Sequence, residues 1–319
     1  MEQRMGERQR WAWLAGGLSV AIGACGCGLG WIWVLMGGIG VGLYYLNIER
    51  VLPRAGLAKM LPKTLAVLTA AWLVLTMAWS ANLADSAFPM VNGFPILGWT
   101  MLTLAAWGSW KGPAVCARCA GVLCLFLLIL YSMVTVFALP DVELPYLVPY
   151  GTWKSGLWAV GLWLLPAAVW YLPCKGKQGP WRFPAVLIVG TTALAAVTAG
   201  VLSPLLAASL SSPLYTLAQS VSLFGVVERI EPMLSATMTM GVFCLLSAMA
   251  CAVARLTEQK WGGPIACGVA AVLMGAVGKL PLGVISAGCI VVFGAVPGAL
   301  IWLRKKDRKK AKKGVDNGA

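Results

Sequence analysis

The basic residues of this chain alternate between the gaps that separate its long apolar stretches. All but three of the 25 Lys and Arg residues lie near the N-terminus, in every second gap or in the C-terminal tail. The exceptions, Lys154, Arg229 and Lys279, lie in the intervening gaps. Those gaps also hold the acidic residues Asp85, Asp141, Glu143, Glu228 and Glu231. Because Lys and Arg collect on the cytoplasmic side of membrane proteins, the alternation predicts a polytopic membrane protein with both termini in the cytoplasm.

The composition agrees with this class. Hydrophobic residues make up 60% of the chain and charged residues only 11%, with a mean hydropathy of +0.81. The net charge is +14, and the C-terminal tail alone holds eight basic residues and two acidic ones. Such a tail is typical of attraction to anionic lipid, at about 1 kcal/mol per basic residue. We therefore expect one transmembrane domain over residues 1–303, a basic cytoplasmic tail over residues 304–319, the lipid bilayer as a partner, and no nucleic acid.

The chain has no histidine, and this excludes the usual zinc ligand and the commonest general base. Cys116 and Cys119 form a C-x-x-C pattern without a second pair, which is more typical of small residues in a helix. The other cysteines are scattered through apolar stretches or lie on the predicted cytoplasmic side, where disulfides are disfavoured. We expect no enzyme activity, no metal site and no cofactor.

Apolar runs of bilayer-spanning length predict about ten transmembrane helices. The apolar stretch of residues 11–45 is too long for one transmembrane helix and short for two. Because Arg10 and Arg50 on its two sides both belong to basic, cytoplasmic segments, it must cross the membrane twice or not at all. A cramped hairpin turning near Gly26-Cys27-Gly28 satisfies both constraints. The expected spans are residues 11–26, 28–46, 64–84, 94–110, 114–139, 154–173, 183–202, 232–254, 264–279 and 282–303. Tryptophans near the predicted span ends are expected to anchor the helices at the interface. They are Trp11, Trp13, Trp110, Trp153, Trp181, Trp261 and Trp302.

Glycines are frequent inside these spans and have two interpretations. One is close helix packing through small residues, which their frequency alone favours. The other is a transporter-like bundle of two five-helix inverted repeats, in which broken first and sixth helices expose backbone groups to a ligand. In that case the ligand-binding residues are Gly23, Gly26, Gly28, Ser155, Gly156 and Gly161. Pro166 is expected to distort the sixth helix, because it lacks an N–H and opposes the carbonyl of Leu162.

Three regions carry a resemblance to a known family. The first is residues 110–123 (WKGPAVCARCAGVL), which hold a glycine and an arginine near the start of the fifth helix. An apolar run follows, and then the loop 139–149 (LPDVELPYLVP), which mixes prolines with apolar residues. The second is residues 212–231, which end in the sequence Glu228-Arg229-Ile230-Glu231. The third is the spacing of the second to tenth spans. Together these features resemble the spore germination permeases, the B subunits of germinant receptors, within the amino acid/polyamine/organocation transporter superfamily.

The resemblance implies an all-α protein of the spore inner membrane in an endospore-forming bacterium. It implies that the chain senses a small nutrient such as an amino acid and signals to A-type and C-type receptor subunits. The first hairpin here is shorter than in the family, so part of the family's ligand pocket is absent or rearranged. Two other functions therefore stay open: a small-solute transporter of the same fold, and a scaffold subunit that has lost its pocket.

Arg229 and Glu231 lie at the predicted exoplasmic entrance to the eighth span. From residue chemistry alone, solvated side chains at the interface explain them, whereas the resemblance implies a structural role that holds the loop against neighbouring helices. No acidic residue lies well inside a span as a proton or cation relay, which favours a sensor over a coupled transporter.

Overall fold

A computed structural model describes residues 5–51, 56–86, 96–174, 182–210, 212–220 and 231–302. Every element among these residues is helical, apart from one isolated β-bridge between Met5 and Cys174. The α-helices are α1 (Glu7–Ala24), α2 (Trp31–Val51), α3 (Lys63–Ser86), α4 (Ile96–Lys111), α5 (Pro113–Ala138), α6 (Trp153–Leu164), α7 (Arg182–Leu202), α8 (Pro204–Ser209), α9 (Pro213–Ser220), α10 (Glu231–Leu256), α11 (Gly262–Val277) and α12 (Leu282–Cys289).

Short segments of tighter or wider helix connect or extend these elements. Five are 3₁₀ turns: η1 (Gly26–Leu29), η2 (Leu57–Met60), η3 (Leu139–Asp141), η4 (Leu144–Leu147) and η5 (Leu165–Tyr171). The sixth, η6 (Ile290–Ala295), is a π-helical turn that continues α12. The residues that follow return to α-helix as far as Trp302.

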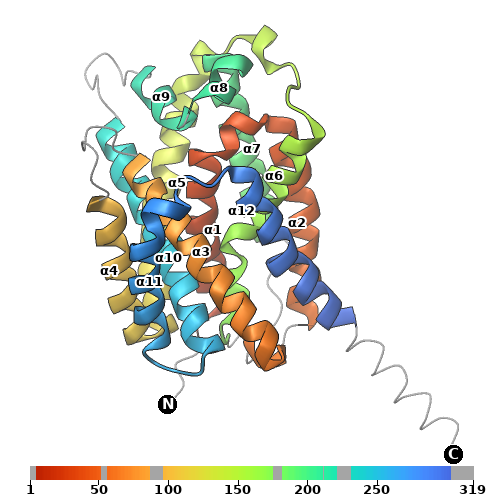
Figure 1. Ribbon diagram of the computed structural model, residues 1–319. Helices are drawn as coiled ribbons and strands as arrows, with labels where there is room; N and C mark the ends of the chain where they lie inside the picture. The colour runs from red at the N-terminus through yellow and green to blue at the C-terminus, as the bar shows by residue number, and fades with distance from the viewer. Residues whose placement is uncertain are drawn as a thin grey trace, which may run out of the picture.

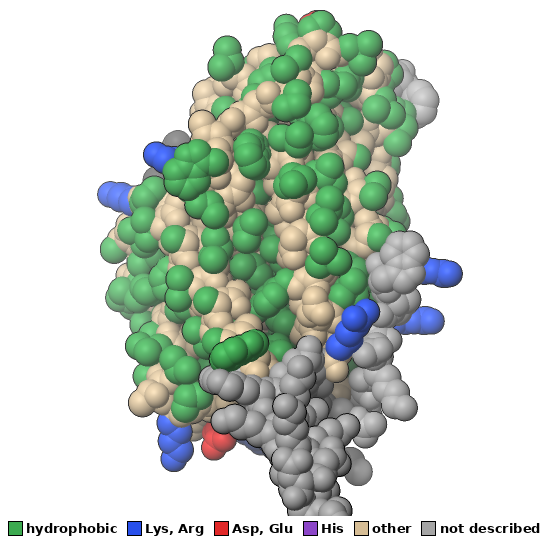
Figure 2. Space-filling view, turned by 90° about the vertical axis from the view of Figure 1, so that its right-hand side faces the viewer, with side chains coloured by type: hydrophobic (Ala, Val, Ile, Leu, Met, Phe, Trp, Pro, Cys, Tyr) green, Lys and Arg blue, Asp and Glu red, His purple; other side chains and the backbone are tan. Residues whose placement is uncertain are grey.

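Six helices in the described part of the chain are long and apolar enough to cross a membrane. They are Trp31–Arg50, Lys63–Asp85, Pro113–Asp141, Arg182–Leu202, Pro232–Leu256 and Leu282–Trp302. Large apolar side chains on their outer faces are exposed, among them Leu43, Phe126 and Val189, and hydrophobic side chains cover most of the face in Figure 2. The chain is thus an all-α bundle with the helices of an integral membrane protein. Helices also occupy the four other predicted spans, but ten crossings remain a prediction.

The helices surround α10, the most enclosed of the six long spans. Helix α10 packs against α1, α3, α4 and α5, while α2 packs against α6 and α7, and α12 packs against α6. The described part of the chain begins and ends at one end of the bundle, and α8 and α9 lie at the other (Figure 1). We call the first the basic end, because it carries Lys59, Lys111 and Lys260, and the second the acidic end, because it carries Asp141 and Glu143.

The predicted interfacial tryptophans divide into two groups. The indoles of Trp110, Trp153, Trp261 and Trp302 are exposed, as membrane anchors require, and Trp181 lies outside the described residues. The prediction is wrong for Trp11 and Trp13, which are 2% and 1% exposed. Helix α1 is enclosed by α5, α10 and η5, so its tryptophans belong to the core. The indole N–H of Trp13 donates to the Cys244 carbonyl at 2.7 Å, which ties α1 to α10.

Helix α12 widens into the η6 turn just before Pro297. Pro297 has no N–H, so the carbonyl of Val292 or Phe293 loses its usual helical donor. The Tyr171 hydroxyl donates to Val292 O at 3.3 Å, and the Tyr44 hydroxyl lies 2.9 Å from Phe293 O. The Tyr44 hydroxyl also lies 2.8 Å from Gly294 O, so two tyrosines from neighbouring segments supply donors to the carbonyls around this turn.

Candidate functional site

The predicted turn of the first hairpin lies where α1 gives way to α2. Helix α1 ends at Ala24, η1 occupies Gly26–Leu29, and α2 begins at Trp31. Gly30 joins them with a φ of 97°, a conformation that L residues other than glycine rarely adopt. This position requires glycine, because an added Cβ would also lie 2.6 Å from the Tyr150 carbonyl oxygen.

Three of the predicted ligand-binding glycines, Gly23, Gly26 and Gly28, lie at this turn. At each of them, atoms of a neighbouring residue occupy the space that a Cβ would need. A Cβ added at Gly23 would lie 2.9 Å from Leu214 of α9. At Gly28 it would lie 2.7 Å from the Ala207 carbonyl oxygen of α8, and at Gly26 it would lie 2.9 Å from Ile22. Gly23 and Gly28 permit close packing against α9 and α8, whereas Gly26 leaves room for Ile22 of α1.

The two predicted ligand-binding segments meet at the indole of Trp33 on α2. A Cβ added at Gly156 of α6 would lie 2.6 Å from this ring, and one at Gly151 would lie 3.0 Å from it. Gly151 also has a φ of 96°, and its Cβ would approach the Leu29 carbonyl oxygen to 2.8 Å. We call this arrangement of Gly30, Trp33, Gly151 and Gly156 the Trp33 junction. It brings η1 and the start of α6 together at the acidic end.

Hydrogen bonds between the loop before α6 and the first hairpin secure the junction. The Tyr150 hydroxyl donates to the Cys27 carbonyl at 3.1 Å, and the Trp31 indole donates to the Leu147 carbonyl at 3.1 Å. Burial raises the pKa of Tyr150 to about 12, so the hydroxyl stays a donor to a higher pH than that of an exposed tyrosine. The Ser155 hydroxyl accepts the Thr152 N–H at 3.3 Å, so Ser155 caps the start of α6.

Gly161 lies deeper in the bundle, where α6 crosses α12. An added Cβ would overlap Ser286, including its backbone Cα. The Ser286 hydroxyl donates to the Trp158 carbonyl at 3.2 Å across the same contact. Gly161 thus serves the packing of α6 against α12, and its neighbours differ from those of the Trp33 junction.

Pro166 changes the form of the sixth helix as expected. Helix α6 ends at Leu164 and continues as the 3₁₀ segment η5, with the Leu165 N–H donating to the Leu162 carbonyl. The sixth helix therefore narrows into a 3₁₀ helix at Pro166, and its two parts are continuous with no unwound segment between them. Pro166 itself packs beside Gly17 of α1, where an added Cβ would lie 3.1 Å away.

Arg229 and Glu231 were also predicted to have a structural role. Arg229 lies outside the described residues, and only the backbone of Glu231, the first residue of α10, is described. A different acidic residue holds a helix in place at the acidic end. Asp85 Oδ1, at the end of α3, accepts the Leu97 and Gly98 N–H groups at 3.1 and 3.3 Å. It thereby satisfies two N–H groups at the start of α4 that have no partner within the helix.

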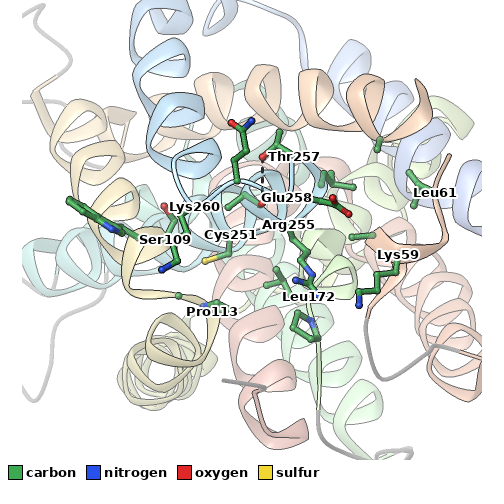
Figure 3. A pocket seen from close by; sticks show the side chains of 18 of the residues that line it. Lys59, Leu61, Ser109, Pro113, Leu172, Cys251, Arg255, Thr257, Glu258 and Lys260 are labelled. Carbon is green, nitrogen blue, oxygen red and sulfur yellow. Dashed lines mark hydrogen bonds between the residues drawn. The ribbon is translucent and has the colours of Figure 1, made fainter. Parts of the chain in front are cut away.

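The described chain also contains a large cavity, at the basic end. Its volume is about 1020 Å³, and the segments around it include η2, the start of α3, the α4–α5 turn and the α10–α11 turn (Figure 3). None of the six predicted ligand-binding residues lines this cavity. The space beside the five glycines among them is filled by packed side chains and backbone, and Ser155 caps α6.

No protein-family model matches the chain, and no curated protein matches it at a significant level. The functional assignment therefore depends on the residues and their arrangement.

Several residues of the junction were not predicted from the sequence. Trp33 lies in an apolar run where nothing distinguishes it from an interfacial or core tryptophan. The Pro149-Tyr150-Gly151 sequence carries a turn signal, since glycine after proline and an aromatic residue marks a tight bend. That signal locates the loop, but it does not show that the loop packs on η1.

Proposed function

We propose that the chain is a ligand-sensing membrane subunit of the spore germination permease type. Its ligand would be a small nutrient such as an amino acid, and its partners A-type and C-type receptor subunits in the spore inner membrane. The observation that carries this proposal is the Trp33 junction, where the turn after the first helix meets the start of the sixth.

The packing of the helices supports a transporter-like repeat. If α1 to α5 correspond to α6, α7, α10, α11 and α12, several contacts occur in matching pairs. Helix α3 packs on α4 as α10 packs on α11, and α1 packs on α5 as α6 packs on α12. Helix α4 packs on α10 as α3 packs on α11. Such pairing is expected of two five-helix halves in opposite orientation.

The two proposed five-helix halves differ in how their first helices pack against the other half. Helix α1 packs closely on α10, whereas the corresponding helices α6 and α3 make little or no contact among the described residues. Helix α6 instead lies against α2 and α12. The first helix is thus a core element here, and the sixth is placed toward one side with its start at the Trp33 junction.

The close packing of the junction favours sensing over transport. A ligand can bind there only if the Trp33 ring or the η1 turn moves, so binding would be coupled to a displacement of helices. A ligand shifts an equilibrium between two conformations when it binds one of them better. Partner subunits that contact the displaced helices would then register the ligand.

A scaffold without a working pocket is the second candidate. The observation that favours it is that all six predicted ligand-binding residues are occupied in packing, capping or turn formation. A small-solute transporter of the same fold remains the third. Uptake of labelled amino acids into vesicles containing the purified chain would distinguish the transporter from the other two.

The proposal is tested in an endospore-forming host whose own copy of the gene has been deleted. We expect that the deletion removes the response to one class of nutrient and that the tagged full chain restores it. The tagged chain should also co-purify from spore membranes with an A-type and a C-type subunit. Co-purification without loss of any nutrient response supports the scaffold, and absence of both results overturns the assignment.

A further inference from the structure

We propose that the cavity at the basic end binds an anionic, phosphate-bearing ligand with an apolar portion. This inference does not depend on the proposed sensing function, which concerns the opposite end of the bundle.

Basic side chains from separate segments converge on this cavity. Lys59 comes from η2, Lys63 from the start of α3, Lys111 from the end of α4, Arg255 from α10 and Lys260 from the turn after α10. Figure 3 shows Lys59 and Arg255 extending toward the same part of the cavity, beside Leu172. Only one acidic residue, Glu258, is among the lining residues. The potential inside is therefore positive, and a concave surface concentrates it.

The start of α5 adds to this potential. Gly112 and Pro113 line the cavity, and Gly112 occupies the N-cap of α5 without a side-chain cap hydrogen bond. The N-terminus of a helix carries a partial positive charge and readily accepts an anion. Here the helix end acts together with the five basic side chains, and it is their combination within one cavity that points to a ligand.

Much of the rest of the wall is apolar, beside the polar Ser109, Thr257 and Gln259, and the apolar part defines the second part of the ligand. Leu61, Val67, Leu172, Pro173 and Leu256 line the cavity between the charged groups. A volume of about 1020 Å³ is at the upper end of the usual range for small-molecule sites. A ligand that carries a phosphate group on an apolar body matches both parts of the wall.

The position of the cavity allows two sources for such a ligand. The exposed indoles of Trp110 and Trp261 lie beside it with ring centroids 4.8 Å apart, as expected at a membrane interface. A phospholipid with an anionic head group can enter from the membrane. A soluble phosphate ester can enter from the aqueous side.

General attraction of basic residues to the membrane surface does not account for this convergence. Arg118 belongs to the same basic end, but its side chain is exposed outside the cavity, where its Nε donates to its own helix at Ala114 O. Removing Arg118 therefore distinguishes overall charge from the charge of the cavity.

The test uses the purified full chain in nanodiscs. One arm adds phenyl phosphate to nanodiscs of phosphatidylcholine, and the other replaces part of the phosphatidylcholine with phosphatidylglycerol. We expect a rise in the thermal midpoint with increasing probe in at least one arm, because a ligand that binds the folded state stabilises it. A rise with phenyl phosphate identifies a soluble ester as the ligand source, and a rise with phosphatidylglycerol alone identifies lipid.

The discriminating variants each remove two exposed cations. The double variant Lys59→Gln/Lys260→Gln should raise the dissociation constant about 25-fold, roughly fivefold for each lysine near the anion. The matched control Arg50→Gln/Arg118→Gln removes two exposed cations of the basic segments that lie outside the cavity and should leave binding within about twofold. The proposal is overturned if neither probe binds the native chain, or if both double variants weaken binding equally.

Discussion

Gly161 shows how closely the helices approach one another. Because a Cβ at this position would overlap the backbone of Ser286, Gly161→Ala should destabilise the protein by about 1 to 3 kcal/mol through overpacking. Gly268 of α11 is the matched control, since nothing lies within 4 Å of its added Cβ. Thermal unfolding in one detergent should show a lower midpoint for Gly161→Ala and no loss for Gly268→Ala. Equal midpoints would show that α6 and α12 are not in this contact.

Tyr150 gives the junction a defined dependence on pH. Its folded pKa of about 12 exceeds the ordinary value of about 10 for tyrosine. Its contribution to stability is thus complete below about pH 10 and is lost as the pH rises toward 12. Tyr150→Phe removes the hydrogen bond to Cys27 O and should cost about 1 kcal/mol at neutral pH. The difference in unfolding free energy between native and Tyr150→Phe protein should shrink above pH 10. A difference that stays constant to pH 12 would contradict the buried hydrogen bond.

At the scale of elements, the π-helical turn of α12 depends on Pro297 and the tyrosines that face it. Tyr44→Phe should lower the unfolding free energy by about 1 kcal/mol, because the part-buried Phe293 and Gly294 carbonyls lose a donor. Pro297→Ala restores a backbone N–H that can take over this role. In a double-mutant cycle, Tyr44→Phe should therefore cost less in the Pro297→Ala background. If the changes in unfolding free energy for Tyr44→Phe and Pro297→Ala simply add, the hydrogen bond of Tyr44 does not compensate for the missing N–H of Pro297.

The positions of the elements could be predicted from the sequence better than their details. Apolar length and basic flanks placed helices in all the expected spans, and Pro166 marked the change of helical form at the correct residue. The burial of Trp11 and Trp13 could not be predicted, because a tryptophan near a span end has the same local sequence whether it faces lipid or α10. The glycine pattern has the same limit, since close packing and ligand access both need small residues. The structure describes the packing, and the ligand role of Gly23, Gly26, Gly28, Ser155, Gly156 and Gly161 stays a prediction.

At the scale of the whole molecule, the orientation follows from the distribution of charge. Lys59 at the basic end should face the cytoplasm, and Glu143 at the acidic end should face the outside. Both side chains are exposed, so single cysteines at these positions are suitable for labelling in a version that lacks the ten native cysteines. A membrane-impermeant reagent applied to intact cells should label position 143 and leave position 59 unlabelled until the cells are opened. The reverse pattern would contradict the assigned orientation.

The nutrient response of spores that carry Gly156→Ala tests the sensing function most directly. The added methyl group would lie 2.6 Å from the Trp33 ring, so the junction must shift at a position expected to bind ligand. We predict that the nutrient concentration for half-maximal germination changes about tenfold, equivalent to about 1.4 kcal/mol, while the amount of protein in the spore membrane is unchanged. Spores that carry Gly268→Ala should respond as the wild type does. An unchanged nutrient response in Gly156→Ala spores would contradict a ligand site at the Trp33 junction.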